Sequence, residues 1–188
     1  MRVEQDVKLT FNDVLIRPKR STLVSRSDVN LEREFSFRHS DEKWCGIPIV
    51  SANMDTTGLF SVAKVLQKYK MLTCTQKFYS TKEFVNSWEE GVNPEYIAIT
   101  CGSTENSFEL VRRKVATNDN LKMICIDVAN GYREVFLKFV RRVREEFPKK
   151  IIIAGNVATR EMTEALILAG ADIVKVGIGP GSVCTTRK

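Results

Sequence analysis

The residues best suited to chemistry lie near the end of the 188-residue chain, in a glycine-rich segment that leads to a cysteine. Residues 177–187 read Gly-Ile-Gly-Pro-Gly-Ser-Val-Cys-Thr-Thr-Arg. The three alternating glycines allow positive φ angles and bring backbone amides or carbonyls close to a ligand. Such a loop can hold a phosphate through N–H groups or surround a monovalent cation with carbonyl oxygens. Arg187 favours a thiolate at Cys184, which would be a nucleophile, whereas the alternative is a flexible turn with an incidental cysteine.

Further candidates follow other apolar runs. Asp55 and Asp127 each stand directly after such a run, where a carboxylate can act as acid, base or ribose ligand. Either could instead cap the helix that follows. Asn130-Gly131 could be a simple turn, and Lys77 could be an ordinary surface lysine.

The elements around these residues show a repeated alternation of strand-like and helix-like segments. Six short runs rich in Val, Ile and Ala start 21 to 28 residues apart. They are Ile47–Val50, Met71–Thr75, Tyr96–Thr100, Met123–Val128, Ile151–Ala154 and Asp172–Val176. The stretches between them have helical spacing or helix-start signals: Leu59–Tyr69, a stretch opening at Thr81, Ser107–Ala116, Tyr132–Phe147 and Thr159–Leu168. Apolar runs without polar alternation are typical of parallel strands buried on both faces.

This alternation predicts an α/β fold, a (β/α)8 TIM barrel of which about the first six strands are present. An open six-stranded sheet is less favoured, because it leaves an exposed edge. We expect residues 1–46 to form an N-terminal extension packed on the barrel, and residues 47–188 to form a partial barrel that ends just after the cysteine loop. The candidate residues then meet at the carboxyl ends of the strands, where such barrels hold their active sites.

Composition restricts the partners. The 29 Lys and Arg residues are interspersed with 23 Asp and Glu, for a net charge of +6. The densest basic run, Arg141–Arg144, is followed at once by two glutamates, which indicates a solvated helix face and not a nucleic-acid surface. A small anion such as a nucleotide fits this charge.

No apolar run approaches the ~20 residues of a membrane span and no signal peptide is visible, so we expect no membrane partner and a cytoplasmic location. The odd count of five cysteines, without a CxxC motif, argues against a disulfide framework or a zinc site.

The loop at 177–187 resembles the cysteine loop shared by IMP dehydrogenases and GMP reductases. Four more segments resemble the GMP reductases in particular: Phe11–Arg20 with Ser25-Arg26, Ala52–Thr56, Ile126–Tyr132 and Ala154–Val157. The resemblance covers the whole chain but only about the first half of the family's length. The dehydrogenases usually carry a regulatory insertion after the second barrel strand, for which Thr75–Thr81 leaves no room.

The resemblance implies NADPH-dependent reductive deamination of GMP to IMP and ammonia. Cys184 would attack C2 of the guanine ring as a thiolate, and Thr186 would help to protonate the leaving ammonia. Implied cofactor contacts are Lys77, Asp127, Val128, Ala129, Ile178 and Gly179, with Ser25 and Arg26 reaching the cofactor of a neighbouring subunit. A potassium ion would be surrounded by Gly179, Gly181, Cys184 and Arg187. The implied assembly is a homotetramer.

Two alternatives to the reductase stay open, namely an IMP dehydrogenase and a catalytically incomplete fragment. The sequence also departs from the family around Lys77, where Gln76 and Phe78 replace the usual pair of histidines. The resemblance therefore includes Lys77 but not its two neighbours. The family's contacts to the GMP phosphate and base come mostly from later barrel strands, so we expect that the 188-residue chain alone neither binds GMP tightly nor turns it over.

Overall fold

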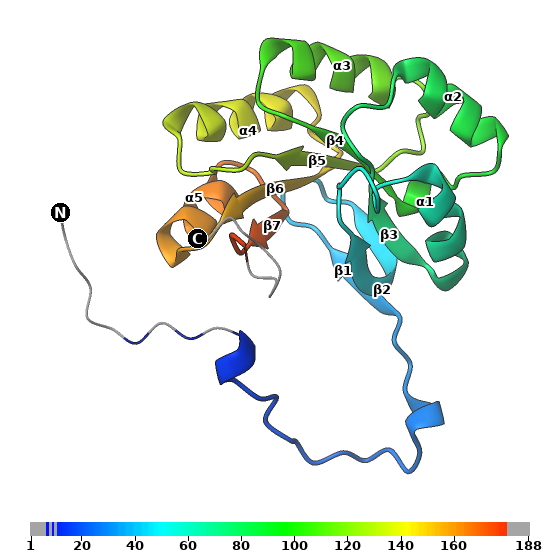
Figure 1. Cartoon of the computed structure of the whole chain (residues 1–188), viewed down its shortest axis with the longest axis vertical. Helices are drawn as coiled ribbons and strands as arrows, with labels where there is room; N and C mark the ends of the chain where they lie inside the picture. The colour runs from blue at the N-terminus through cyan, green and yellow to red at the C-terminus, as the bar shows by residue number, and fades with distance from the viewer. Residues whose placement is uncertain (1–6, 8, 10, 180–188) are drawn as a thin grey trace.

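The computed structural model describes residues 7, 9 and 11–179, and its centre is a seven-stranded sheet (Figure 1). The strands follow one another in chain order: β1 (Arg33–Ser36), β2 (Lys43–Ser51), β3 (Met71–Cys74), β4 (Ile97–Cys101), β5 (Met123–Asp127), β6 (Ile151–Val157) and β7 (Ile173–Val176). The first pair is antiparallel and all the later pairs are parallel. The six predicted strands are β2 to β7, and the predicted α/β class is confirmed.

Five α-helices alternate with the parallel strands and lie along the outer face of the curved sheet (Figure 1). They are α1 (Phe60–Leu66), α2 (Thr81–Glu89), α3 (Glu105–Val115), α4 (Glu134–Glu146) and α5 (Arg160–Leu168). Short 3-10 turns occupy Phe11–Asp13, Arg26–Asp28, Gln67–Tyr69 and Pro94–Tyr96. All five predicted helical stretches are present, with ends that shift by up to two residues at most boundaries.

Local sequence explains where the helices begin and end. The side chain of Ser80 accepts a hydrogen bond from the backbone N–H of Glu83, whose carboxylate accepts one from the N–H of Ser80, which is a capping box. The side chain of Thr159 caps α5 with a single bond, which it accepts from the N–H of Met162. Gly170 follows α5 with φ +105°, a conformation that favours glycine and ends the helix.

The strands bury side chains on both faces, in two separate clusters. The larger cluster lies between the sheet and the helices and includes Phe84, Ile99 and Phe136. The smaller one lies on the inner face of the sheet and includes Leu72, Met123 and Ile153. An inner cluster on a sheet that carries helices on its outer face is the arrangement of a barrel interior and differs from a doubly wound sheet.

The hairpin of β1 and β2 was not predicted. Its first strand, Arg-Glu-Phe-Ser, contains no apolar run, so it lacks the signal that identified the other strands. Phe35 nevertheless stacks on Trp44 with ring centroids 6.1 Å apart, and both side chains join the inner cluster.

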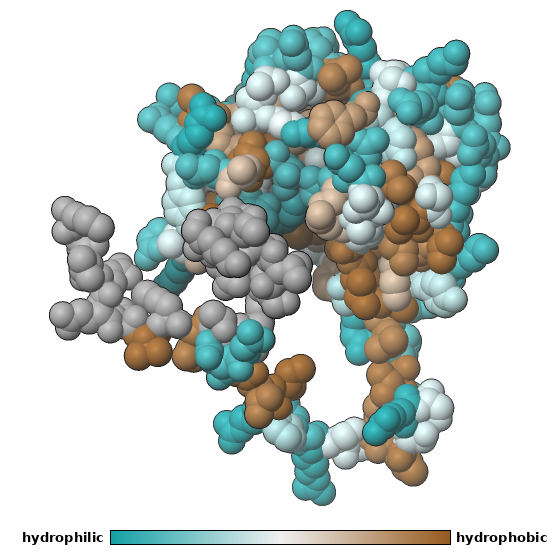
Figure 2. All heavy atoms as spheres, viewed as in Figure 1, coloured by the Kyte–Doolittle hydropathy of each residue, from teal (hydrophilic) through white to brown (hydrophobic). Residues whose placement is uncertain are grey.

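The segment before this hairpin is an extended arm. Residues 12–31 are all exposed, and Leu15, Ile16 and Val24 keep 97%, 97% and 98% of their surface (Figure 1). Figure 2 shows hydrophobic side chains along this arm. The boundary that we place at residue 46 stays a prediction. None of the helices in the described part of the chain combines the length and apolar character that crossing a membrane requires.

Candidate active site at the carboxyl ends of the strands

A lysine on the last strand joins three strand ends at the carboxyl edge of the sheet. Lys175, on β7, donates hydrogen bonds to the carboxylate of Asp127 at the end of β5 and to the side-chain oxygen of Asn53 after β2, the latter at 2.9 Å. The Lys175 and Asp127 side chains keep 26% and 30% of their surface, so the pair is accessible from the mouth of the sheet. The arrangement fixes the Asp127 carboxylate where a ligand can reach it.

The electrostatics of Lys175 keep it charged. Burial favours the neutral amine, but Cys125 and Asp127 outweigh this effect, so the pKa of Lys175 is raised above its ordinary value. Beneath it lie two buried thiols on the inner face of the sheet. The pKa of Cys74 is raised well above the usual range because its thiol hydrogen bonds to Cys125 and is buried. The raised pKa keeps the Cys74 thiol protonated, unlike a catalytic cysteine, whereas the same hydrogen bond lowers the pKa of Cys125.

Asn156, near the end of β6, connects the loops after β5 and β7. Its side-chain amide donates to the carbonyl of Gly177 at 3.0 Å, and its carbonyl accepts from the N–H of Gly131 at 3.1 Å. The N–H of Asn156 also donates to the carbonyl of Val128 at 3.0 Å, while the N–H of Val128 donates to Gly155 at 2.9 Å. The predicted cofactor residue Val128 is thus held by the backbone of Asn156, and the start of the cysteine loop by its side chain.

The cysteine loop begins as the glycine pattern predicts. Gly177 and Gly179 have φ of +131° and +58°, and a side chain at either position would be strained. Ile178 lies between them, half-buried. Gly181, Cys184, Thr186 and Arg187 lie outside the described residues, so the nucleophile and most of the predicted potassium ligands stay predictions. No group of three or more His, Cys, Asp or Glu that could hold a metal occurs in the described part of the chain.

The remaining predicted residues fall in three places. Ala129, exposed on the same loop as Val128, and Lys77, exposed after β3, both lie beyond carboxyl strand ends. Ser25 and Arg26 lie on the exposed arm, where Ser25 caps a 3-10 turn, and the single chain does not bring them to the other residues (Figure 1). Their reach to a neighbouring subunit stays a prediction.

Two of the open alternatives are now decided. The Asn130 side chain accepts from the N–H of Tyr132 at 3.0 Å, so Asn130-Gly131 forms a turn. The helix-capping alternative is wrong for both aspartates, because α1 starts after Leu59 and α4 after Arg133. Asp55 is exposed in the loop after β2, whereas Asp127 belongs to the network. Asn53, Asn156 and Lys175 were not predicted as site residues. A lysine inside the apolar run Ile173–Val176 was the signal that could have found Lys175, because a charge in a buried strand requires a partner.

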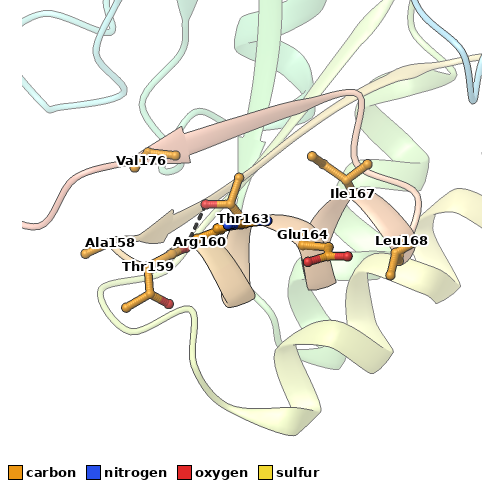
Figure 3. A pocket seen from close by; sticks show the side chains of 8 residues that line it. All are labelled: Ala158, Thr159, Arg160, Thr163, Glu164, Ile167, Leu168 and Val176. Carbon is orange, nitrogen blue, oxygen red and sulfur yellow. Dashed lines mark hydrogen bonds between the residues drawn. The ribbon is translucent and has the colours of Figure 1, made fainter.

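A separate hollow borders α5 and the end of β7. It has a volume of about 620 Å³ and runs along α5 beside β7 (Figure 3). Its lining residues are Ala158, Thr159, Arg160, Thr163, Glu164, Ile167, Leu168 and Val176. None of the predicted site residues lines it, so size alone does not make it the active site.

The whole chain matches one family at the level of sequence. The profile of the IMP dehydrogenase / GMP reductase domain matches residues 8–188. The chain belongs to the IMP dehydrogenase / GMP reductase family. Curated GMP reductases from Klebsiella pneumoniae and Shigella boydii are each 55% identical to it over 190 aligned residues. These alignments cover all of this chain and 54% of each relative.

A solved IMP dehydrogenase gives the family fold. The crystal structure of inosine 5′-monophosphate dehydrogenase from Legionella pneumophila superposes with a TM-score of 0.79 and 29% identity. The match covers 95% of this chain and 53% of that one, so the sheet is the matching part of the family's TIM barrel. The chain spans about half the length of the relatives and the solved structure that it matches.

Proposed function

We propose that this chain is the N-terminal part of an NADPH-dependent GMP reductase, which converts GMP to IMP and ammonia in purine nucleotide interconversion. The 55% identity to curated GMP reductases across the whole chain carries the proposal. The network at the carboxyl edge supports it, because the predicted cofactor residues Asp127 and Val128 are held there beside the first glycine of the cysteine loop.

In the proposed reaction, Cys184 adds to C2 of the guanine ring as a thiolate. The amino group on that carbon leaves as ammonia after a proton reaches it with the help of Thr186, which gives a covalent thioimidate. NADPH, when bound, supplies the hydride that C2 receives. The C–S bond then breaks, which releases IMP and restores the Cys184 thiolate.

The donor set at the strand ends fits a dinucleotide. Lys77 offers an exposed cation for a phosphate, and the Asp127 carboxylate can accept hydrogen bonds from ribose hydroxyls. Ala129, Ile178 and Gly179 would line the same mouth, and Ser25 and Arg26 would reach the cofactor of a neighbouring subunit. The positive φ of Gly179 turns its backbone in a way that suits a carbonyl cage for potassium with Gly181, Cys184 and Arg187. The proposal includes a homotetramer as the assembly of the complete protein and a cytoplasmic location.

An IMP dehydrogenase is the second candidate, supported by the superposition on the Legionella enzyme. The identity of 29% with that chain, against 55% with the curated reductases, favours the reductase. The two activities are separated by their substrates, since a reductase oxidises NADPH in the presence of GMP and a dehydrogenase reduces NAD in the presence of IMP.

A chimera that adds the later barrel strands of a relative tests the proposed activity. The 188 residues are joined to the part of the Klebsiella reductase that follows the matched region, and the absorbance of NADPH is followed after GMP is added. We expect turnover by this chimera and none by the 188 residues alone, because most GMP contacts in the family come from later strands. NADPH oxidation by the 188-residue chain would contradict the second expectation, and a chimera active only with IMP and NAD would favour the dehydrogenase.

Cys184→Ala in the chimera tests the nucleophile. We expect turnover to fall to the background rate while circular dichroism stays unchanged, because no other group can form the thioimidate. Cys45→Ala is the matched control, since Cys45 is an exposed free cysteine on β2. Retained activity in Cys184→Ala, or equal loss in Cys45→Ala, would contradict the assignment.

A further inference from the structure

A second, smaller pocket opens between the end of β4 and one face of α3. Its volume is about 170 Å³. Its lining residues are Lys77, Phe78, Thr100, Cys101, Gly102, Ser107, Leu110, Val111 and Lys114. Two of these described residues are lysines and none is acidic, so the pocket is electropositive.

Lys114 forms the floor of this pocket and is unusually buried for a lysine. Only 2% of the residue is exposed, although lysines are almost never fully buried without a partner. Its ammonium donates to the backbone carbonyl of Lys77 at 3.3 Å and lies 5.2 Å from the centre of the Phe84 ring. An ammonium has three N–H donors, and among the described residues this carbonyl is its one hydrogen-bond acceptor.

The charge of Lys114 is therefore poorly compensated. Burial lowers the pKa of Lys114 below its ordinary value, against the opposing effects of Cys101 and Glu83. Glu83 itself is held in the capping box by Ser80. An anion inside the pocket would supply the acceptors that the ammonium lacks.

The mouth of the pocket carries the other cation. Lys77 is exposed, and its ammonium lies 5.2 Å from the centre of the neighbouring Phe78 ring. The hydroxyl of Ser107, which also lines the pocket, lies 2.9 Å from that of Thr104 and can donate to a ligand. Two cations and a hydroxyl that line one pocket suit a ligand with several acceptor oxygens and more than one negative charge.

We propose that this pocket binds a phosphate group, with the Lys114 ammonium on its floor and Lys77 at its mouth. A phosphate carries up to two charges and three strong acceptor oxygens, which matches these donors. The phosphate can belong to the dinucleotide cofactor or to free phosphate. If it belongs to the cofactor, the inference rests on the proposed function, and Lys114 becomes a further cofactor-binding residue from a helix that the family comparison did not single out.

Differential amine labelling of the unmodified chain tests the pocket without any substitution. The chain is treated with acetic anhydride alone, with inorganic phosphate, with NADPH and with NADH, and the acetylation of each lysine is measured by mass spectrometry. Lys150 is the internal control, because it is also partly buried but lies at the other end of the sheet, where it donates to the carbonyl of Leu121 at 2.6 Å. We expect phosphate to protect Lys114 and Lys77 and to leave Lys150 unchanged.

The cofactor arms identify the source of the phosphate. Protection by NADPH at lower concentration than by NADH assigns the pocket to the additional phosphate of NADPH, whereas equal protection assigns it to the phosphates that the two share. Protection by inorganic phosphate alone supports a site for free phosphate and leaves the reductase proposal to its own test. Absence of protection in every arm, or equal protection of Lys150, overturns the proposal.

A pair of variants adds a measurement of affinity. Lys114→Met removes the charge but keeps a long apolar side chain, and Lys150→Met is its matched control. Phosphate is titrated against the thermal unfolding temperature of each variant. We expect Lys114→Met to weaken phosphate binding by about tenfold, through loss of a charge-assisted hydrogen bond, while Lys150→Met binds as the parent does. Unchanged phosphate binding by a folded Lys114→Met overturns the proposal, and the labelling experiment decides the matter if that variant does not fold.

Discussion

Asp172 and Arg144 form an ion pair with several further hydrogen bonds in the interior of the described part of the chain. The Asp172 side chain is fully buried and accepts from Arg144, from the N–H of Ile152 at 3.0 Å and from the N–H of His39 at 3.3 Å. The Arg144 guanidinium also donates to the carbonyls of Gly170 and Lys150 at 2.8 Å each. This one pair therefore connects α4, the start of β6, the turn before β7 and the segment between β1 and β2.

Asp172→Ala tests that connection. We expect it to lower the free energy of unfolding by about 3 kcal/mol, because it leaves a mostly buried guanidinium without its counter-charge. Urea unfolding followed by circular dichroism measures the change. Glu109→Ala is the control, since Glu109 pairs with Arg112 where the two side chains are 45% and 50% exposed, and its loss is expected to cost less than about 1 kcal/mol. Equal effects of the two substitutions would contradict the role given to Asp172.

Single residues of the candidate site could be predicted where they follow a strand, and not where they depend on distant contacts. Asp127 stands at the end of an apolar run, so its place at the carboxyl edge could be predicted. Lys175 and Asn53 are 122 positions apart in sequence, and only the curvature of the sheet brings their side chains to 2.9 Å (Figure 1). No local pattern encodes such a contact, which is why the network around Lys175 was missed.

At the scale of elements, apolar runs were sufficient to place β2 to β7, because buried parallel strands need them on both faces. The same rule could not find β1, whose pairing comes from its neighbour β2 and from one aromatic contact. The starts of α2, α3 and α5 follow from side-chain caps, and α2 starts at the predicted Thr81 because Ser80, directly before it, takes the capping role.

The capping box of α2 makes part of the stability depend on pH. Hydrogen bonds from the side chain and backbone of Ser80 lower the pKa of Glu83 below its ordinary value of 4.5. A carboxyl whose pKa is lower in the folded state stabilises the fold above the unfolded pKa, and this contribution is lost as the pH falls through the folded value. We expect Glu83→Gln to lower the unfolding temperature at neutral pH, and we expect the difference from the parent to vanish in acid.

Thermal unfolding between neutral pH and pH ~3 measures this effect. Glu89→Gln, at the other end of α2, is the control and is expected to leave the acid slope of the parent unchanged. A difference between Glu83→Gln and the parent that stays constant down to the acid end would contradict the origin given to the slope.

At the scale of the whole molecule, the sheet carries an open edge and an apolar groove. Among the described residues β7 pairs only with β6, and the groove along α5 exposes Ile167, Leu168 and Val176 at 45%, 74% and 61% (Figure 3). On the first parallel strand, Ile49 and Val50 are also about half exposed. Open edges and contiguous apolar surface favour association. We therefore expect the 188-residue chain to associate with itself at high concentration, through the β7 edge and the α5 groove.

Leu168→Lys tests this expectation, because it places a charge on the most exposed apolar side chain of the groove without touching the core. Sedimentation equilibrium is expected to show a lower average mass for Leu168→Lys than for the parent at the same concentration. Val135→Lys is the matched control: Val135 is 53% exposed on α4, outside the groove, and its substitution is expected to leave the mass unchanged. Joining the chain to the later half of a relative should have the same effect as Leu168→Lys, because the added strands and helices cover the same surface. If Val135→Lys lowered the mass equally, association would depend on net charge and not on the groove, and the open edge would have no part in it.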